Sequence, residues 1–391
     1  MSGKLIRIKD LDANTDTYYF YDLTNRLMRY EVKDSSTGAV IYATEYNYNE
    51  LNNLESATET VKDKDYSYSY TYNQDNSLSS MVVDDSEAGA TDLTLEYSYD
   101  DLGRLTGYQV KENAQNVISR TIQYKQRADG FTTTLIGNWI QSYGSTTKTH
   151  AYTFDGNSNI KTVTVGGKKI SYVYDTLGQL TRVNDQVLNE TWTYSYDLGG
   201  NILSKKRYAY TEGTLGTVLE SISYGYTDSD WSDLLTSYNG NTITYDQIGN
   251  TLSDGTWTYT WENGRQLAEQ SNGATTVWYT YDANGQRLTK ESGNLKYYYL
   301  YDGITLKHLR VADEATDDTI WEMYFQYGQT GLEAIEYIQG SLKDTYYVVT
   351  NLQGDVIGLI DGSGTEVVSY TYDAGGNLRS MTGSLASTVG T

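Results

Sequence analysis

The chain has 391 residues, a formal net charge of −22 and a pI near 4.4, with no cysteine and no proline. Such acidity disfavours nucleic acid and anionic membranes as partners, because both bind through clustered Lys and Arg, and the absence of Cys removes disulfide, thiolate-metal and cysteine-nucleophile chemistry. The missing Pro, where average usage would give roughly twenty, suits an uninterrupted hydrogen-bonded sheet, and no stretch approaches about eighteen apolar residues, so we expect no membrane-spanning segment.

The first predicted elements are hairpin turns in which an aromatic residue precedes Asp or Asn. Three phrases near the N-terminus place Asn three residues after that Asp or Asn: Tyr21-Asp22 with Asn25, Tyr48-Asn49 with Asn52, and Tyr72-Asn73 with Asn76. Asn is the non-glycine residue that best tolerates the left-handed backbone region. Before the third phrase, tyrosines at every second position from 66 to 72 alternate with Ser and Thr, which predicts a strand with two different faces.

Six later copies are strict and read aromatic-x-Tyr-Asp-x-x-Gly. Asp at the first position of a type I turn can accept a hydrogen bond from the backbone two residues on, and Gly at the fourth position supplies the positive φ that closes the hairpin. Gly is usually followed by Arg, Asn or Gln and then Leu or Ile, which we expect to form the return strand. The predicted structural turn residues are Tyr99, Asp100, Gly103, Tyr174, Asp175, Gly178, Tyr196, Asp197, Gly200, Tyr245, Asp246, Gly249, Tyr281, Asp282, Gly285, Tyr372, Asp373 and Gly376.

The phrase varies toward the C-terminus without a break in composition. Around Trp261 the loop shortens to Asn263-Gly264, the strongest two-residue hairpin signal. After Tyr301 the copies weaken, and residues 346–350 form an apolar strand. We therefore predict one continuous array over residues 1–391, with regular repeats over 1–300 and less regular repeats over 301–391.

These elements predict an all-β fold of tandem antiparallel hairpins. The chain has 41 Tyr and only 4 Phe, and Tyr is a strong strand former whose hydroxyl stays wet while its ring packs on neighbours. A thin sheet, solvated on one or both faces and with little solid core, would select this composition. Open strand edges also make edge-to-edge self-association a possible property of the chain.

The repeated Tyr-Asp-x-x-Gly phrase, with Leu in the return strand, resembles the RHS or YD-repeat family of bacterial polymorphic toxins, insecticidal toxin complexes and animal teneurins. The resemblance covers nearly the whole chain, and its end resembles the stretch just before the family's RHS core module. Family members usually continue into a Pro- and Arg-containing segment, a self-cleaving aspartyl protease motif and a variable toxic domain. Because Met1 to Lys4 lead straight into a strand pattern without an apolar signal region, we expect either a removed leader or an excised fragment.

The resemblance implies a continuous sheet that spirals into part or all of a hollow shell. It implies a non-enzymatic structural segment of a secreted or cell-surface bacterial protein, whose wall encloses its own C-terminal toxin or core module for delivery. The toxin or core module would be the main partner. No cofactor is expected.

Catalytic and metal sites find little support in the sequence. Only two histidines are present, His150 and His308, and each lies in a strand-like run with no Ser-His-Asp or His-metal spacing. Asp recurs at one fixed turn position, so a turn cap explains it better than glycosidase chemistry. A calcium loop beginning at Asp10 lacks its Gly and its closing Glu. We therefore predict no catalytic residue and no metal ligand.

A binding function is the alternative prediction. Trp257, Tyr259, Trp261 and Trp278 resemble, more loosely, the aromatic-Gly repeats of bacterial cell-wall and glucan-binding modules. Exposed aromatic ladders suit sugar or choline ligands, so cell-surface glycans are a second candidate partner. The Asp directly after Tyr and the Leu of the return strand favour the shell.

Overall fold

The computed structural model describes residues 4–87 and 92–390, so Met1 to Gly3, on which the expectation of a removed leader or an excised fragment partly rests, lie outside the described residues. Every regular element in the described part of the chain is a β-strand, which confirms the predicted all-β fold. Accordingly, none of the described residues belongs to a helix long and apolar enough to cross a membrane.

The first sheet holds twenty strands, and each pairs antiparallel with its neighbours in sequence. The strands are β1 (Arg7–Asp10), β2 (Thr15–Tyr21), β3 (Leu27–Asp34), β4 (Val40–Tyr48), β5 (Leu54–Val61), β6 (Lys64–Tyr72), β7 (Leu78–Asp85), β8 (Leu93–Tyr99), β9 (Leu105–Glu112), β10 (Gln115–Gln126), β11 (Thr132–Tyr143), β12 (Thr146–Phe154), β13 (Ile160–Val165), β14 (Lys168–Tyr174), β15 (Leu180–Asp185), β16 (Glu190–Tyr196), β17 (Ile202–Ala209), β18 (Glu220–Gly225), β19 (Ser237–Tyr238) and β20 (Asn241–Thr242).

The second sheet holds fourteen strands and continues the same meander. They are β21 (Thr244–Tyr245), β22 (Thr251–Ser253), β23 (Thr258–Glu262), β24 (Gln266–Ser271), β25 (Thr276–Tyr281), β26 (Arg287–Ser292), β27 (Leu295–Asp302), β28 (Thr305–Asp313), β29 (Thr319–Gly328), β30 (Gly331–Gln339), β31 (Leu342–Thr350), β32 (Val356–Ile360), β33 (Glu366–Tyr372) and β34 (Leu378–Thr382). The shortest strands, β19 to β22, lie where one sheet gives way to the other.

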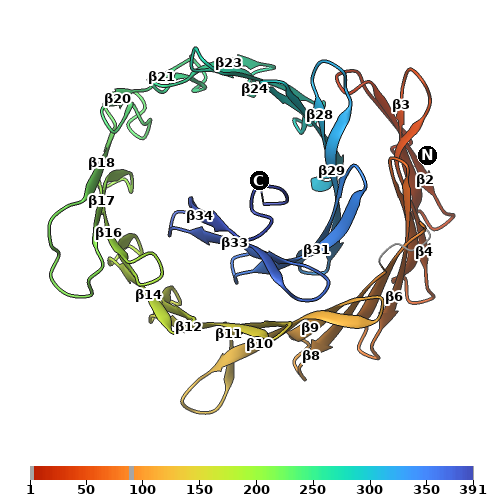
Figure 1. Cartoon of the computed structure of the whole chain (residues 1–391), viewed down its shortest axis with the longest axis horizontal. Helices are drawn as coiled ribbons and strands as arrows, with labels where there is room; N and C mark the ends of the chain where they lie inside the picture. The colour runs from red at the N-terminus through yellow and green to blue at the C-terminus, as the bar shows by residue number, and fades with distance from the viewer. Residues whose placement is uncertain (1–3, 88–91, 391) are drawn as a thin grey trace.

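The meander winds into an inward spiral (Figure 1). The sheet passes once around a ring and returns beside its own beginning, so that β28, β29 and β31 lie inside β3 to β9 and the C-terminus lies in the middle. The inner turn has the smaller radius. Two residues that touch across the outer and inner turns are therefore separated by fewer positions in the sequence as the chain advances toward the C-terminus. The separation falls from 273 residues for Asp10–Ala283 to 209 for Gln141–Thr350 and 189 for Glu190–Arg379.

The overlap of the two turns creates a solid core that the composition did not predict. Fully buried side chains from the outer turn, such as Val110 and Ile118, belong to one apolar cluster with Val349 and Ile360 of the inner turn. The expectation of a thin wall with little core is therefore wrong in this part of the molecule. The family resemblance implied a spiral, but the alternating pattern of the strands did not predict that one turn of the spiral packs against the other.

Strand β31 is buried on both faces. Tyr347 and Val349 face the outer turn, while Tyr346 and Val348 belong to a second cluster that includes Val389 near the C-terminus. This explains why residues 346–350 form a continuous apolar run, because a strand covered on both sides has no solvated face to fill with polar residues.

Candidate functional site

The repeated turn is the most regular site in the molecule, and its Asp side chain organises it. In all six strict copies one carboxylate oxygen accepts hydrogen bonds from the backbone N–H groups two and four residues later, at 2.7 to 3.0 Å. The N–H of the motif Gly donates to the carbonyl of the same Asp at 2.9 to 3.3 Å. These bonds satisfy the backbone groups that the reversal of the chain leaves without ladder partners.

The fourth position of each turn has a left-handed backbone. The six motif glycines have φ between 74° and 92°, and Asn25, Asn52 and Asn76 have φ of 74°, 68° and 72° in the same place. The ladder shifts register at the motif Tyr in each hairpin, for example between Ser98 and Tyr99, which is the bulge that such a turn produces.

Two of the turn carboxylates show how the turn holds such a group in its charged form. The side-chain hydrogen bond from Arg104 lowers the pKa of Asp100, and that from Asn201 lowers the pKa of Asp197. A general acid needs a raised pKa, so these groups are unsuited to the acid role of a glycosidase pair. Their geometry is that of a turn cap.

The motif tyrosines join neighbouring hairpins, a role that the sequence interpretation missed. Nine tyrosines that directly precede a turn Asp or Asn, and also Tyr124 and Tyr327, donate a hydroxyl hydrogen bond at 2.7 to 3.0 Å to an earlier backbone carbonyl, which lies at or near the start of a strand. The pairs are Tyr21–Leu5, Tyr48–Leu27, Tyr72–Leu54, Tyr99–Leu78, Tyr124–Leu105, Tyr174–Ile160, Tyr196–Leu180, Tyr245–Leu235, Tyr281–Leu267, Tyr327–Leu306 and Tyr372–Val356. Trp261 makes the equivalent bond through its indole N–H to the Thr251 carbonyl at 2.7 Å.

The preference for Tyr over Phe was the available signal for these bonds. A hydrophobic role alone would accept either ring, whereas a donor at the ring edge requires Tyr or Trp. We call these bonds the tyrosine stitches.

Buried polar contacts join the outer and inner turns of the spiral. Arg120 of β10 forms an ion pair with Glu333 of β30 at 2.6 Å, and both side chains are almost fully buried. Its guanidinium also donates to the Val348 carbonyl at 2.5 Å. Further along, Gln141 donates to the Thr350 carbonyl at 2.6 Å and its side-chain oxygen accepts from the Thr350 N–H at 3.2 Å. These contacts join side chains of the outer turn to side chains and backbone groups of the inner turn.

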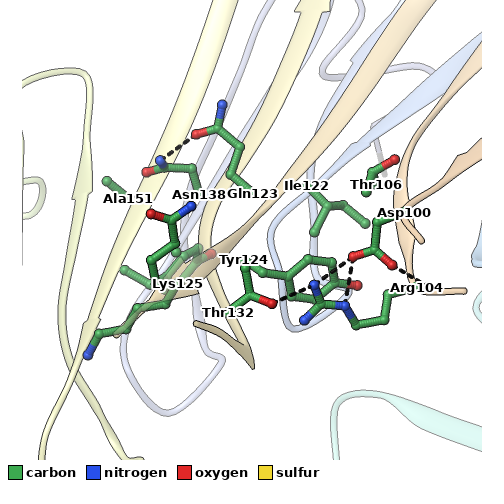
Figure 2. Close-up of a pocket in the computed structure, with 13 residues that line it drawn as sticks. Asp100, Arg104, Thr106, Ile122, Gln123, Tyr124, Lys125, Thr132, Asn138 and Ala151 are labelled. Atoms are coloured by element: carbon green, nitrogen blue, oxygen red, sulfur yellow. Dashed lines mark hydrogen bonds and ion pairs between the residues drawn. The ribbon is translucent and has the colours of Figure 1, made fainter. Parts of the chain in front are cut away.

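An open groove of about 600 Å³ lies beside one turn on β9 to β12. Figure 2 shows the Asp100 carboxylate turned toward Arg104, whose guanidinium reaches the Thr132 hydroxyl at 3.0 Å. Arg104 also stacks over the Tyr124 ring, 4.1 Å from its centroid. The charged groups of this groove that face each other are thus already paired, and they link two hairpins.

The four aromatic residues of the glycan prediction do not form one ladder. Trp257, Tyr259 and Trp261 are half-buried on one face of the sheet, whereas Trp278 is exposed and pairs across the ladder with Glu269 on the opposite face. The Tyr259 hydroxyl donates a hydrogen bond to the Asp254 carboxylate at 2.7 Å. The structure therefore gives this alternative no shared aromatic surface.

The two histidines lie in the overlap of the spiral and are buried. Burial lowers the pKa of His150 to about 4, so it is neutral at pH 7. His308 donates a hydrogen bond from Nε2 to the Glu322 carboxylate at 2.8 Å and packs on the Tyr324 ring, and burial lowers the pKa of His308. Within residues 4–87 and 92–390 no group of three His, Asp or Glu side chains could hold a metal ion. Asp10, which opens the calcium-like phrase, instead accepts N–H groups from Asp12, Ala13 and Ala283.

Comparison with known proteins agrees with this geometry. Among curated proteins, the tRNA3(Ser)-specific nuclease WapA of Bacillus spizizenii is 34% identical over 188 residues, and the tRNA nuclease WapA of Bacillus subtilis is 31% identical over 187. Each match covers 47% of this chain but only 7% of the relative, so the chain spans a small part of the length of these nucleases.

Solved structures show the same fold at low sequence identity. The Tc holotoxin pore of Photorhabdus luminescens aligns with a TM-score of 0.59 at 13% identity, over 97% of this chain and 20% of that chain. The crystal structure of TcdB2-TccC3-Cdc42 aligns with a TM-score of 0.53 at 12% identity, over 95% of this chain and 23% of that chain.

A family model described as the teneurin YD-shell matches residues 150–384, which is more than half of the chain. The resemblance to RHS and YD-repeat proteins is thereby confirmed. The chain belongs to the teneurin YD-shell family, and its hairpins build a structural shell wall.

Proposed function

We propose that this segment encloses a polypeptide of its own protein, the C-terminal toxin or effector, as a non-enzymatic wall. One observation carries the proposal: the spiral turns inward, so the last described residues lie inside the ring (Figure 1). Val389 packs on the inner strands, and the Gly390 carbonyl accepts a hydrogen bond from Tyr370 at 3.1 Å. Any polypeptide that continues from this point starts inside the wall.

The relatives support a separation between a structural wall and an active part of the same protein. The WapA proteins are named as tRNA nucleases, but the matched segment is 7% of their length. We assign their nuclease activity to a part outside that segment, and we assign to this chain the enclosure of such a part in a secreted or cell-surface protein. The absent partner is then the toxin or core module. Self-association stays a prediction, and the sheet ends in the short strands β1 and β34, which offer little edge to a second copy.

A cysteine placed after the chain tests the enclosure. Because the chain contains no cysteine, a single Cys on a short Gly-Ser linker after Thr391 reports alone. The matched control carries the same linker and Cys before Met1. We expect a small maleimide to label both proteins at similar rates and a large polymer-linked maleimide to label the C-terminal Cys several-fold more slowly.

Equal labelling of both positions by the large reagent would contradict the enclosure. A glycan array screened with the same protein tests the alternative function, since specific binding at micromolar strength would count against a purely structural role. The Trp278→Ala variant is its control, because Trp278 is the most exposed of the four predicted glycan contacts.

A further inference from the structure

Lys64 is a buried lysine that meets three carboxylates. It is the first residue of β6, and it is only 4% exposed. Its Nζ contacts Glu336 of the inner turn and lies 3.3 Å from Asp85 Oδ2 and 3.7 Å from Glu87. Asp85 is the last residue of β7, so this lysine and this aspartate meet at the open end of one hairpin, away from its turn. Burial of charged groups is costly, and a reaction that removes two charges relieves that cost.

The surroundings of the Lys64 ammonium shield it from bulk water. The centroids of the Tyr324 and Tyr66 rings lie 4.8 and 6.0 Å from its Nζ. Asp85 and Glu336 are each 8% exposed. Both also line a cavity of about 20 Å³, which has room for one water molecule. The site thus brings together an amine, two carboxyl groups and space for one water.

The two buried carboxyl groups differ in the partner of their second oxygen. Asp85 Oδ1 accepts the N–H of Glu87 at 3.0 Å, and such a backbone donor stabilises the oxyanion that forms when a nucleophile attacks a carboxyl carbon. Glu336 Oε1 pairs with the ammonium of Lys343 at 3.0 Å, which leaves the oxygen in contact with Lys64 to accept a proton. Asp85 is therefore suited to be attacked, and Glu336 is suited to take up and return protons.

We propose that Lys64 and Asp85 form an intramolecular amide bond in the folded protein. Nζ of the lysine bonds to Cγ of the aspartate, and the Cγ–Oδ2 bond breaks. The ammonium gives up two protons, which Glu336 relays to Oδ2, and Oδ2 leaves as water into the cavity. One proton stays on the amide nitrogen, and Glu336 ends as the carboxylate that it was, so no oxidant or reductant takes part. The bond closes the hairpin of β6 and β7 at its open end.

Mass spectrometry of the intact, denatured full chain tests the amide. We expect the purified protein to be lighter than its sequence by the mass of one water molecule. Chymotrypsin cleaves after the tyrosines that lie between the two linked positions. The digest should therefore contain two peptides joined through Lys64 and Asp85. A chain that keeps its full mass after prolonged incubation would overturn the proposal.

Two variants test the roles of the carboxyl groups. Asp85→Ala removes the attacked group and should keep its full mass. Glu336→Gln keeps the shape of the side chain but cannot take up the proton, and it should slow the loss of water by about 10²-fold or more. Circular dichroism shows whether each variant folds, and the mass of the unaltered chain decides the proposal even where a variant does not.

Lys148→Met is the matched control. Lys148 also pairs with a carboxylate of the inner turn, Glu366, but the two side chains are 26% and 28% exposed. This variant should lose one water like the unaltered chain. Full mass in Lys148→Met would place the amide at the wrong lysine.

The joined peptides separate the amide from other dehydrations. Cyclisation of an Asp-Gly pair such as Asp254-Gly255 to a succinimide also releases one water, but it joins no peptides, and that result would overturn the proposal. Peptides joined through Lys64 and Glu336 would overturn the assignment of Asp85 as the attacked group. None of these outcomes bears on the enclosure, which the cysteine labelling tests separately.

Discussion

The same hairpin builds two regions of different strength. Where the spiral overlaps, in the double layer of outer strands β3 to β12 and inner strands β28 to β33, aliphatic side chains are fully buried. Across residues 220–292, the single layer of β18 to β26, only Asn250, Val277 and Tyr279 are buried. The turns and tyrosine stitches are alike in both. The comparison indicates that the repeat joins neighbouring hairpins in both regions, whereas the overlap of the two turns adds a buried apolar core.

The stability of the two regions therefore depends on different interactions. Burial of apolar area contributes about 25 cal/mol per Å², and the double layer gains it from two sheets at once. The single layer relies on ladder bonds, turn caps, stitches and cross-strand pairs worth about 0.2–1 kcal/mol each. We expect changes in the double layer to act on the whole molecule and changes in the single layer to act locally.

The largest expected effect comes from alkaline pH. Burial raises the pKa of Tyr97 and Tyr152 to about 12, against about 10 in an unfolded chain. Their neutral form is favoured on folding, so stability is fully present below pH 10 and is lost as the pH rises from 10 to 12. Each contributes at most about 3 kcal/mol, and together they should unfold the double layer. Circular dichroism with tyrosinate absorbance checks this, and full ionisation near pH 10 with the structure intact would contradict it.

The second effect comes from the buried ion pair. Arg120→Met leaves Glu333 buried without its partner and should lower the free energy of unfolding by about 3–5 kcal/mol. Adding Glu333→Leu should restore most of that stability, because the uncompensated charge is gone. At the border of the single layer, Lys296→Met on β27 breaks the partly exposed pair with Glu291 on β26 and should cost less than about 1 kcal/mol. Urea unfolding measures the stability of all three variants. Equal losses of unfolding free energy in Arg120→Met and Lys296→Met would contradict the difference between the two regions.

The third effect tests a turn outside the double layer, between β16 and β17. Gly200 has a φ of 92°, so Gly200→Val forces a β-branched residue into the left-handed region and should cost about 1–3 kcal/mol. Gly200→Asn should cost less, since Asn occupies the same position in other turns. Thermal melting compares them. A Val variant that melts like the unaltered protein would show that the turn assignment is wrong there.

The smallest effect tests the stitches. Tyr196→Phe removes the hydroxyl that donates to the Leu180 carbonyl at 2.7 Å and should cost about 0.5–1.5 kcal/mol. Phe154 occupies the same place before Asp155 in a turn without a stitch donor, so Phe154→Tyr should have the opposite sign. Hydrogen exchange of the flanking strands shows whether the change is local. Unchanged stability in both variants would mean that the hydroxyl bonds contribute nothing.

The sequence predicts the hairpins well because their causes are local. Asp, Asn and Gly fix the turn within five residues, and alternation fixes the faces of each strand. The family could be recognised from the same phrase. The division into regular repeats over 1–300 and less regular repeats over 301–391 stays a prediction, and so does the structural role of each motif residue until the variants above are measured.

The overlap could not be predicted because it has a global cause. The pairing of Arg120 with Glu333 depends on the curvature accumulated over a separation of 213 positions, and no local signal carries that sum. The contact of Lys64 with Glu336 has the same origin, since the two residues come from different turns of the spiral. The stitches were predictable in principle, because Tyr recurs where Phe would suffice for packing.

The stitches also have a direction. In every pair the hydroxyl belongs to the later hairpin and the carbonyl to the earlier one, as in Tyr48 and Leu27. When a new hairpin leaves the ribosome, the carbonyl that accepts its tyrosine hydrogen bond has already been synthesised. The wall can therefore form hairpin by hairpin from its N-terminal end as synthesis proceeds. Deleting N-terminal hairpins leaves the hydroxyl of the next motif tyrosine without its acceptor. Deleting C-terminal hairpins leaves only a backbone carbonyl without a donor. As far as the stitches are concerned, the array should therefore tolerate the loss of hairpins from its C-terminal end better than from its N-terminal end.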